Sequence, residues 1–321
     1  MRKILVLGGT GWLGSEIAAA AIRAGDSVTC LARGDSGDIP SGAMLERSDR
    51  SKPGAYDGVA GTDWDDVIEI AWENPFVLGA LDALAGRAAH WTLVSTISVY
   101  ASNSAAGADE TAELVVPSDL SDYGQAKVAA ERASAAAVGD RLLIARPGLI
   151  AGPGDRSDRL GYWVARLAAS NDDALIPVGD GRSVQVIDVR DLATWIARTG
   201  AMTGTVNAVG NQHSLRETLD RAAHAAGFTG DFVEANDDWL LANDVNYWAG
   251  PRSLPLWLPL EDAAMAQRSN DAFQAAGGIL RDLDATLRDT LTDERLRGLD
   301  RPRRSGLTRS DETKLLKALR D

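Results

Sequence analysis

The 321-residue sequence has little cysteine, little histidine and no long uninterrupted apolar run. Its single cysteine, Cys30, excludes an intrachain disulfide and suits a reducing compartment. The histidines, His90, His213 and His224, are scattered without the spacing of metal ligands, so we expect no metal site. The longest uncharged stretch, residues 88–107, contains too many serines and asparagines to span a bilayer.

Positive charge is also scarce. The chain has 33 lysines and arginines against 46 aspartates and glutamates, which gives a net charge of −13. This excess repels phosphate backbones, and the only short basic patch is residues 301–304. The basic N-terminus resembles that of a signal peptide, but glycines interrupt the apolar run and no cleavage site follows. We therefore expect a cytoplasmic protein that acts on a small molecule, with no nucleic-acid or membrane partner.

Short apolar runs alternate with alanine-rich helical stretches in the first half of the chain. Because the runs are continuous, they predict strands that are buried on both faces. The alternation predicts an α/β fold with a doubly wound parallel sheet of the Rossmann type. Strands are expected at residues 3–7, 27–31, 43–46, 66–71, 91–95 and 141–145, and helices at 16–24, 77–87 and 124–137.

The pattern loosens after about residue 150. Residues 183–189 and 205–209 predict two further strands, with a helix beginning near Asp191. We predict a dinucleotide-binding Rossmann domain over residues 1–150 and a smaller, mainly substrate-binding region over 151–321. Within that region, residues 183–210 are expected to return to the Rossmann sheet.

A glycine-rich turn, residues 8–14, follows the first predicted strand and opens the first predicted helix. It reads Gly-Gly-Thr-Gly-Trp-Leu-Gly and matches G-x-G-x-x-G. Glycine permits the tight turn and lets the backbone approach a pyrophosphate, whose charge the helix N-terminus attracts. The position of the motif favours a dinucleotide site over an ordinary turn. A P-loop is excluded because Ser15 stands where that motif needs lysine.

The end of the second predicted strand, Leu31-Ala32-Arg33, indicates which dinucleotide binds. An acidic residue there would bind the ribose 2′-hydroxyl of NAD. Alanine removes that carboxylate, and Arg33 offers a charged donor to a 2′-phosphate. We therefore predict NADP, with NAD as the alternative, because Arg33 could equally be a solvated loop residue beside Asp35.

Tyr123 and Lys127 stand four residues apart at the start of a strong predicted helix, and so share one face. A lysine cation near a phenol lowers the pKa of tyrosine from about 10 towards neutrality. Such a tyrosine can exchange a proton with a carbonyl or hydroxyl oxygen. The fifth predicted strand ends in hydroxyl residues, Thr96 and Ser98 among them, which can stabilise charge that develops on that oxygen.

These motifs together resemble the short-chain dehydrogenase/reductase superfamily. They are the glycine turn, the strand end Ser95-Thr96-x-x-Val99-Tyr100, and Tyr123-x-x-x-Lys127. The chain is most similar to the extended or atypical branch, the NAD-dependent epimerase/dehydratase family and its reductase-like members. The resemblance covers roughly residues 1–210 and implies a Rossmann fold.

The resemblance implies roles for individual residues. Thr96 matches the catalytic serine or threonine, Tyr123 the acid/base, and Lys127 the residue that binds the nicotinamide ribose and tunes the tyrosine. Asp49 and Arg50 match a stretch that contacts adenine. The full set of expected cofactor contacts is Gly8, Thr10, Gly11, Trp12, Leu13, Gly14, Arg33, Asp49, Arg50, Ile70, Ala71, Lys127, Pro147 and Gly148.

Three hypotheses for the function remain. The first is an NADP(H)-dependent reductase that transfers hydride between nicotinamide and a small carbonyl or alcohol, with Tyr123 as acid/base. The alternative is an NAD-dependent nucleotide-sugar epimerase or dehydratase, and a further alternative is a non-catalytic dinucleotide sensor. Arg156 or Arg159 could hold an anionic substrate group, and Gln185 is a candidate polar contact. Relatives of this kind are often dimers, so a homodimer is also considered.

Overall fold

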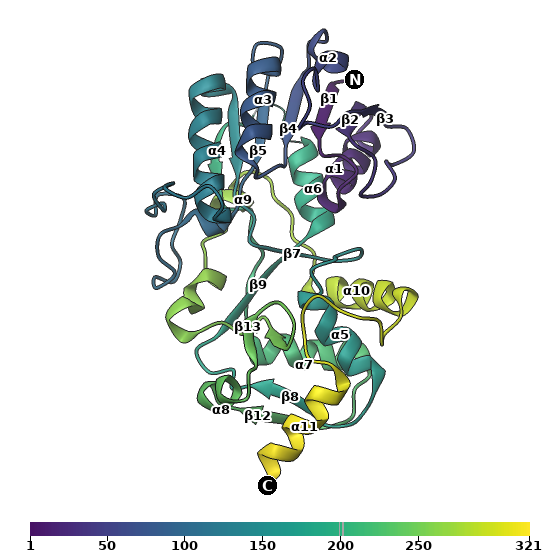
Figure 1. Cartoon of the computed structure of the whole chain (residues 1–321), viewed down its shortest axis with the longest axis vertical. Helices are drawn as coiled ribbons and strands as arrows, with labels where there is room; N and C mark the ends of the chain where they lie inside the picture. The colour runs from purple at the N-terminus through teal and green to yellow at the C-terminus, as the bar shows by residue number, and fades with distance from the viewer. Residues whose placement is uncertain (199, 201) are drawn as a thin grey trace.

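A seven-stranded parallel sheet forms the N-terminal half of the molecule in the computed structural model, which describes residues 1–198, 200 and 202–321 (Figure 1). The strand order is β10-β6-β5-β4-β1-β2-β3, and all neighbours run parallel. This confirms the predicted doubly wound Rossmann sheet. The strands are β1 (Lys3–Leu7), β2 (Ser27–Ala32), β3 (Met44–Arg47), β4 (Asp66–Glu69), β5 (Trp91–Val94), β6 (Leu142–Ala145) and β10 (Gly204–Val206).

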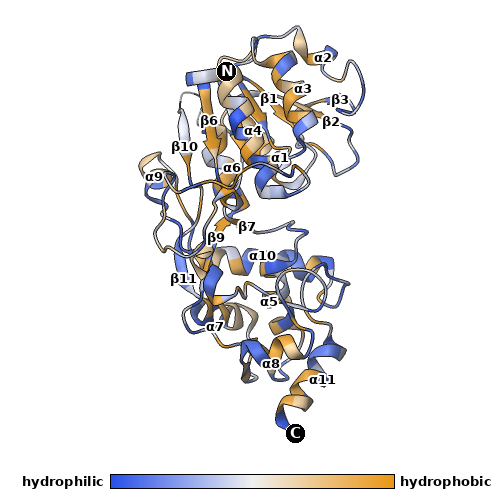
Figure 2. Ribbon diagram, turned by 60° about the vertical axis from the view of Figure 1, so that its left-hand side comes forward, coloured by the Kyte–Doolittle hydropathy of each residue, from blue (hydrophilic) through white to orange (hydrophobic). Residues whose placement is uncertain are grey.

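Helices cover both faces of this sheet. One core packs Ile4 and Val6 of β1 with α1 (Trp12–Arg23) and α6 (Val189–Arg198). The other packs Leu5 and Leu7 with α3 (Asn74–Leu84) and α4 (Tyr123–Val138). Alternate residues of one strand thus enter opposite cores, which is why the strand is apolar throughout. Figure 2 shows this hydrophobic sheet between helices with hydrophilic outer faces. The short helices of this half are α2 (Asp57–Ala60), η1 (Ile97–Val99) and η2 (Gly139–Arg141).

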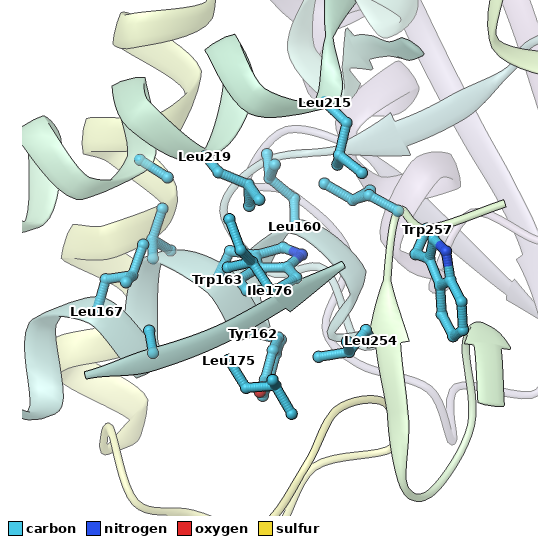
Figure 3. Packing of buried hydrophobic residues seen from close by; sticks show 14 of the residues in the cluster. Leu160, Tyr162, Trp163, Leu167, Leu175, Ile176, Leu215, Leu219, Leu254 and Trp257 are labelled. Carbon is cyan, nitrogen blue, oxygen red and sulfur yellow. The ribbon is translucent and has the colours of Figure 1, made fainter. Parts of the chain in front are cut away.

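The C-terminal half is built on small sheets and has its own core. Trp163 and Trp257 are buried there with Tyr162 and several leucines (Figure 3). One sheet has three strands, β7 (Leu149–Ala151), β9 (Ser183–Asp188) and β11 (Gln212–Ser214). Two further sheets have two strands each: β8 (Ala174–Pro177) pairs with β12 (Phe232–Ala235), and β13 (Asn246–Trp248) pairs with β14 (Ser253–Pro255). The helices are α5 (Arg159–Ala169), α7 (Leu215–Ala226), α8 (Asp237–Ala242), η3 (Leu260–Ala266), α10 (Leu283–Arg297) and α11 (Arg309–Arg320). The short helix α9 (Asp271–Ala275) belongs to this part of the sequence, but its Phe273 packs against Trp195 in the core of the N-terminal half.

The segment 183–210 divides between the two halves. Its helix α6 packs against α1, and its strand β10 forms the edge of the seven-stranded sheet. Its strand β9, however, pairs with β7 and β11 outside that sheet. Residues 199 and 201 of this segment lie outside the described residues. The domain division at residue 150 stays a prediction.

Local side-chain hydrogen bonds set several element ends that the sequence analysis placed elsewhere. β4 ends at Glu69, whose carboxylate accepts from the Ala71 amide at 2.8 Å. α4 begins at Tyr123 because the Asp122 side chain caps it through the Gln125 amide. Among the described residues, no helix has both the length and the apolar character needed to cross a membrane.

Candidate functional site

A cleft of about 920 Å³ opens where β1, β4, β5 and β6 end. In a parallel sheet, all these carboxyl ends lie at the same edge, which is where ligands bind in folds of this type. The C-terminal half closes the cleft from the other side. The lining includes thirteen residues of interest from both halves, Thr10, Gly11, Trp12, Leu13, Ile70, Thr96, Tyr123, Lys127, Pro147, Gly148, Arg156, Arg159 and Trp248.

The glycine turn presents an uncapped helix start to this cleft. α1 begins at Trp12 with Gly11 as its N-cap, without a side-chain cap and without an acidic residue in the first turn. Gly8 has a φ of +101°, and a Cβ at Gly14 would overlap the Gly8 carbonyl oxygen. Because the first amide groups of a helix lack internal acceptors, this donor set fits the pyrophosphate of a dinucleotide. Gly8 and Gly14 shape the turn but do not line the cleft.

Arg33 lies away from the cleft lining. Its side chain is 64% exposed, and its Nε lies 3.6 Å from the carboxylate of Asp35, which is 72% exposed. The residues after it, Ser36 to Asp38, fold over the cleft instead. Arg156 holds this loop by donating to the Ser36 carbonyl oxygen at 3.2 Å.

Arg50 is engaged in a buried ion pair rather than exposed to the cleft. It binds Glu69 through both terminal nitrogens and donates from Nε to the Tyr56 hydroxyl at 2.9 Å. Asp49 accepts from the amide and hydroxyl of Ser51, which lowers the pKa of Asp49. Neither Asp49 nor Arg50 lines the cleft. The sequence motifs do not indicate Glu69, although a carboxylate inside a predicted apolar strand is an available signal.

Thr96 and Tyr123 lie in the same cleft. Thr96 caps η1 by accepting from the Ser98 amide at 3.1 Å, and it is nearly buried. Tyr123 is 45% exposed, and its ring makes an edge contact with the ring of Trp72, with 6.0 Å between the ring centres. A Cβ at Gly124 would overlap the Ser98 carbonyl oxygen, so glycine after the tyrosine allows α4 to approach the end of β5. This close approach of the two backbones brings the hydroxyl groups of Thr96 and Tyr123 together.

Lys127 is buried and its ammonium group is held by three backbone carbonyls. Nζ donates to Val94 at 2.6 Å, to Ala71 at 2.8 Å and to Ile70 at 3.1 Å. Burial lowers the pKa of Lys127 to about 8, against the attraction of nearby glutamates. Ala71 itself contributes this carbonyl but is outside the cleft lining.

The expected lowering of the Tyr123 pKa by Lys127 is wrong for this structure. Burial raises the pKa of Tyr123, and the Thr96 hydroxyl and the charge of Arg159 act in the opposite direction. Lys127 has no part in this shift, because its ammonium group is directed to the ends of β4 and β5. The cation that acts on the phenol is Arg159, which the sequence analysis considered only for the substrate.

A buried ion pair supports the end of β5 from behind. Arg146 donates to both carboxylate oxygens of Glu131, at 2.9 and 2.7 Å, and to the Tyr100 hydroxyl at 3.0 Å. Ser95 donates to the same carboxylate at 2.6 Å. Burial lowers the pKa of Arg146, but the hydrogen bonds and charge of Glu131 outweigh it and raise the pKa. The strand end that carries Thr96 is therefore fixed by charge as well as by packing.

Gln185 is committed to backbone groups outside this cleft. Its Nε2 donates to the carbonyl oxygens of Gly210 and Arg268, and its Oε1 accepts from the Arg268 amide. No group of histidine, cysteine, aspartate or glutamate residues in the described part of the chain is arranged to hold a metal ion.

Comparison with known proteins finds a matching family and several solved structures with the same fold. Residues 4–207 match the model of the NAD dependent epimerase/dehydratase family. A protein of Burkholderia cenocepacia J2315, provisionally described as an epimerase, is 24% identical, with a TM-score of 0.72 over 92% of this chain and 98% of that one. UDP-N-acetylglucosamine 4-epimerase from Bacillus cereus is 17% identical, with a TM-score of 0.69 over 94% and 99%.

A third similar structure is UDP-glucose 4-epimerase of Thermus thermophilus, solved in complex with NAD. It is 19% identical, with a TM-score of 0.66 over 91% of this chain and 99% of that one. A comparison with curated protein sequences finds no match.

Proposed function

Because the chain belongs to the NAD-dependent epimerase/dehydratase family, we propose that it is an enzyme that binds a nicotinamide dinucleotide and acts on a hydroxyl or carbonyl group of a small molecule. One observation carries the proposal: Thr96 and Tyr123 share a cleft with the uncapped start of α1. The helix start would hold the pyrophosphate, while Ile70, Pro147 and Gly148 would contact the remainder of the dinucleotide.

The bound dinucleotide would supply a hydride acceptor and donor. Tyr123 would exchange a proton with the substrate oxygen, and Thr96 would donate a hydrogen bond to that oxygen as its charge changes. Lys127 lines the same cleft, and one of the three N–H donors that its ammonium group directs to backbone carbonyls would turn to the nicotinamide ribose. Three carbonyl oxygens accept hydrogen bonds from its ammonium group, which holds this positive charge at the ends of β4 and β5.

The family favours an epimerase or dehydratase over the net reductase that the sequence analysis placed first. In that reaction, hydride leaves the substrate and returns to it within one catalytic cycle. The epimerase structures with the same fold are consistent with this choice, and the Thermus enzyme was solved with NAD. A nucleotide sugar is the corresponding substrate class.

A net reductase that uses NADP is the second candidate, and the end of β2 favours it. Ala32 offers no carboxylate to a ribose 2′-hydroxyl, and the exposed Arg33 could turn to a 2′-phosphate. A charged hydrogen bond of about 1.5–3 kcal/mol would give a roughly 10- to 100-fold preference for NADP. Arg33→Ala should then weaken NADPH binding and leave NADH binding unchanged.

A melting assay with the four nicotinamide dinucleotides tests the proposal. Stabilisation by at least one of them is expected, and it should disappear in Gly14→Val. Tightly bound oxidised NAD without net turnover would favour the epimerase or dehydratase, whereas substrate-dependent NADPH consumption would favour the reductase. If no dinucleotide stabilises the protein, the proposal is refuted. If Tyr123→Phe retains full activity, the assignment of Tyr123 is refuted. Homodimer formation and a cytoplasmic location stay predictions.

A further inference from the structure

Arg159 is a partly buried cation in the candidate site that has no carboxylate partner in the described part of the chain. It lines the cleft with Thr96 and Tyr123. Its Nε donates to the Ser157 hydroxyl at 3.1 Å, and no acceptor among the described residues binds its two terminal nitrogens. Neither terminal nitrogen is enclosed in the protein, so a ligand that enters the cleft can reach both of them.

Neighbouring arginines in the same region are paired, which sets Arg159 apart. Arg297, Arg301 and Arg303 share the carboxylates of Asp158 and Glu294, both of which are buried. This cluster fixes the loop from which α5 starts, and Arg159 is the first residue of that helix.

Two other cleft arginines, Arg156 and Arg304, are exposed at the rim, where water can satisfy them. Arg159 is the least exposed of the three. Its unused hydrogen-bonding groups therefore indicate a ligand more strongly than theirs do.

Trp248 lies beside the Arg159 guanidinium group. The guanidinium carbon lies 5.2 Å from the centre of the Trp248 ring, in a cation–π contact. Trp248 also has a φ of +64°, a conformation that bulky residues rarely adopt, and it lines the same cleft. With Trp248 beside its guanidinium group and its Nε bound to Ser157, Arg159 keeps one edge for a ligand, the edge formed by its two terminal nitrogens.

The chemistry of that edge selects a carboxylate. Two parallel N–H groups of a guanidinium match the two oxygens of a carboxylate. Asp155 also lines the cleft, and its charge acts on Arg159. That negative charge favours a ligand with one charge over a doubly charged phosphate group.

We propose that Arg159 binds a carboxylate of the substrate close to the carbon that reacts, so that the substrate, whether a nucleotide sugar or a smaller molecule, is a hydroxy acid or an oxo acid. The inference rests on the proposed function, since it uses Tyr123 as the neighbour of the reacting oxygen. Arg159 and Tyr123 line the same cleft, and the charge of Arg159 acts on the Tyr123 phenol. An acid bound by Arg159 would thus present its adjacent oxygen to Tyr123 and Thr96.

The test compares carboxylates with their neutral amides. Pyruvate, lactate, 3-hydroxybutyrate and glucuronate are each titrated beside the corresponding amide, into protein saturated with the dinucleotide that stabilises it most. We expect at least one acid to bind, and its amide to bind about 10- to 100-fold more weakly. Inorganic phosphate serves as the doubly charged probe and is expected to bind more weakly than that acid.

Variants locate the effect at Arg159. Arg159→Gln should lose the preference for acid over amide while dinucleotide stabilisation persists, and Arg159→Lys should keep part of the preference. The matched control is Arg132→Gln, which removes an exposed arginine of α4 that lies outside the cleft lining and should change neither property.

The outcomes separate this inference from the proposed function. If no dinucleotide stabilises the native protein in the melting assay, the proposed function is refuted. If a dinucleotide does stabilise the protein, three results overturn only the Arg159 inference. They are that no acid binds, that phosphate binds more tightly than every acid, or that Arg159→Gln keeps the full preference for acid over amide. If Arg159→Gln does not fold, an unchanged preference in Arg159→Lys overturns the bidentate arrangement.

Discussion

Substitution of Arg146 tests whether the buried ion pair behind the candidate site stabilises the fold. Arg146→Met removes the partner that binds both oxygens of Glu131, and it leaves that carboxylate buried with the Ser95 hydroxyl. Removing one partner of a buried pair costs about 3–5 kcal/mol. We expect a loss in this range, because Arg146 also donates to Tyr100.

The assay is urea unfolding followed by tryptophan fluorescence. Arg132→Met is the control, since it makes the same change at an exposed position next to Glu131 in the sequence and should change stability by less than about 0.5 kcal/mol. The double variant Arg146→Met with Glu131→Leu should lose less than the sum of the two single variants, because it leaves no unpaired buried charge. A loss below about 1 kcal/mol in Arg146→Met, or additive effects, would refute the reasoning.

Three further predictions concern the turn, the phenol and pH. Gly14→Ala should abolish dinucleotide stabilisation in a melting assay, since the added Cβ would overlap the Gly8 carbonyl oxygen. The control is Gly61→Ala, whose Cβ would lie in open space and should leave the stabilisation unchanged. Unchanged binding in Gly14→Ala would contradict the tight turn. Tyr123→Phe should lower turnover by about 10²- to 10⁴-fold with dinucleotide binding intact, and a smaller loss measured by steady-state kinetics would argue against its role as acid/base. Burial lowers the pKa of His90, but Asp66 and the Met202 carbonyl outweigh it and raise the pKa. The stability from protonated His90 is thus fully present below about pH 6.5 and is lost as pH rises through the raised value. His90→Gln should therefore destabilise the protein more at pH 5.5 than at pH 9, and urea unfolding with equal losses at both would contradict this.

The arrangement of the N-terminal half could be predicted from sequence because its signals are local. Continuous apolar runs such as Lys3–Leu7 indicate strands buried on both faces, and the glycine turn directly after that run indicates where a helix start meets a ligand. The spacing of Tyr123 and Lys127 likewise follows from one helix. Each of these properties depends on residues that are neighbours along the chain.

Electrostatic partners, by contrast, depend on residues far apart in the sequence. Lys127 could reach either Tyr123 or the strand ends, and only the packing of α4 against β4 and β5 directs it to the strand-end carbonyls. Arg50 looked available to a ligand until the fold placed Glu69 beside it.

The C-terminal half shows the same limit for the substrate. Arg156 and Arg159 are equivalent in the sequence, three residues apart in one loop and helix start. The tertiary structure leaves one exposed at the rim and places the other against Trp248 and near Tyr123. Sequence alone determined the sheet, the glycine turn and the residue types of the site. Tertiary structure decided which charges are paired and which remain for a ligand, because pairing is set by distance in space.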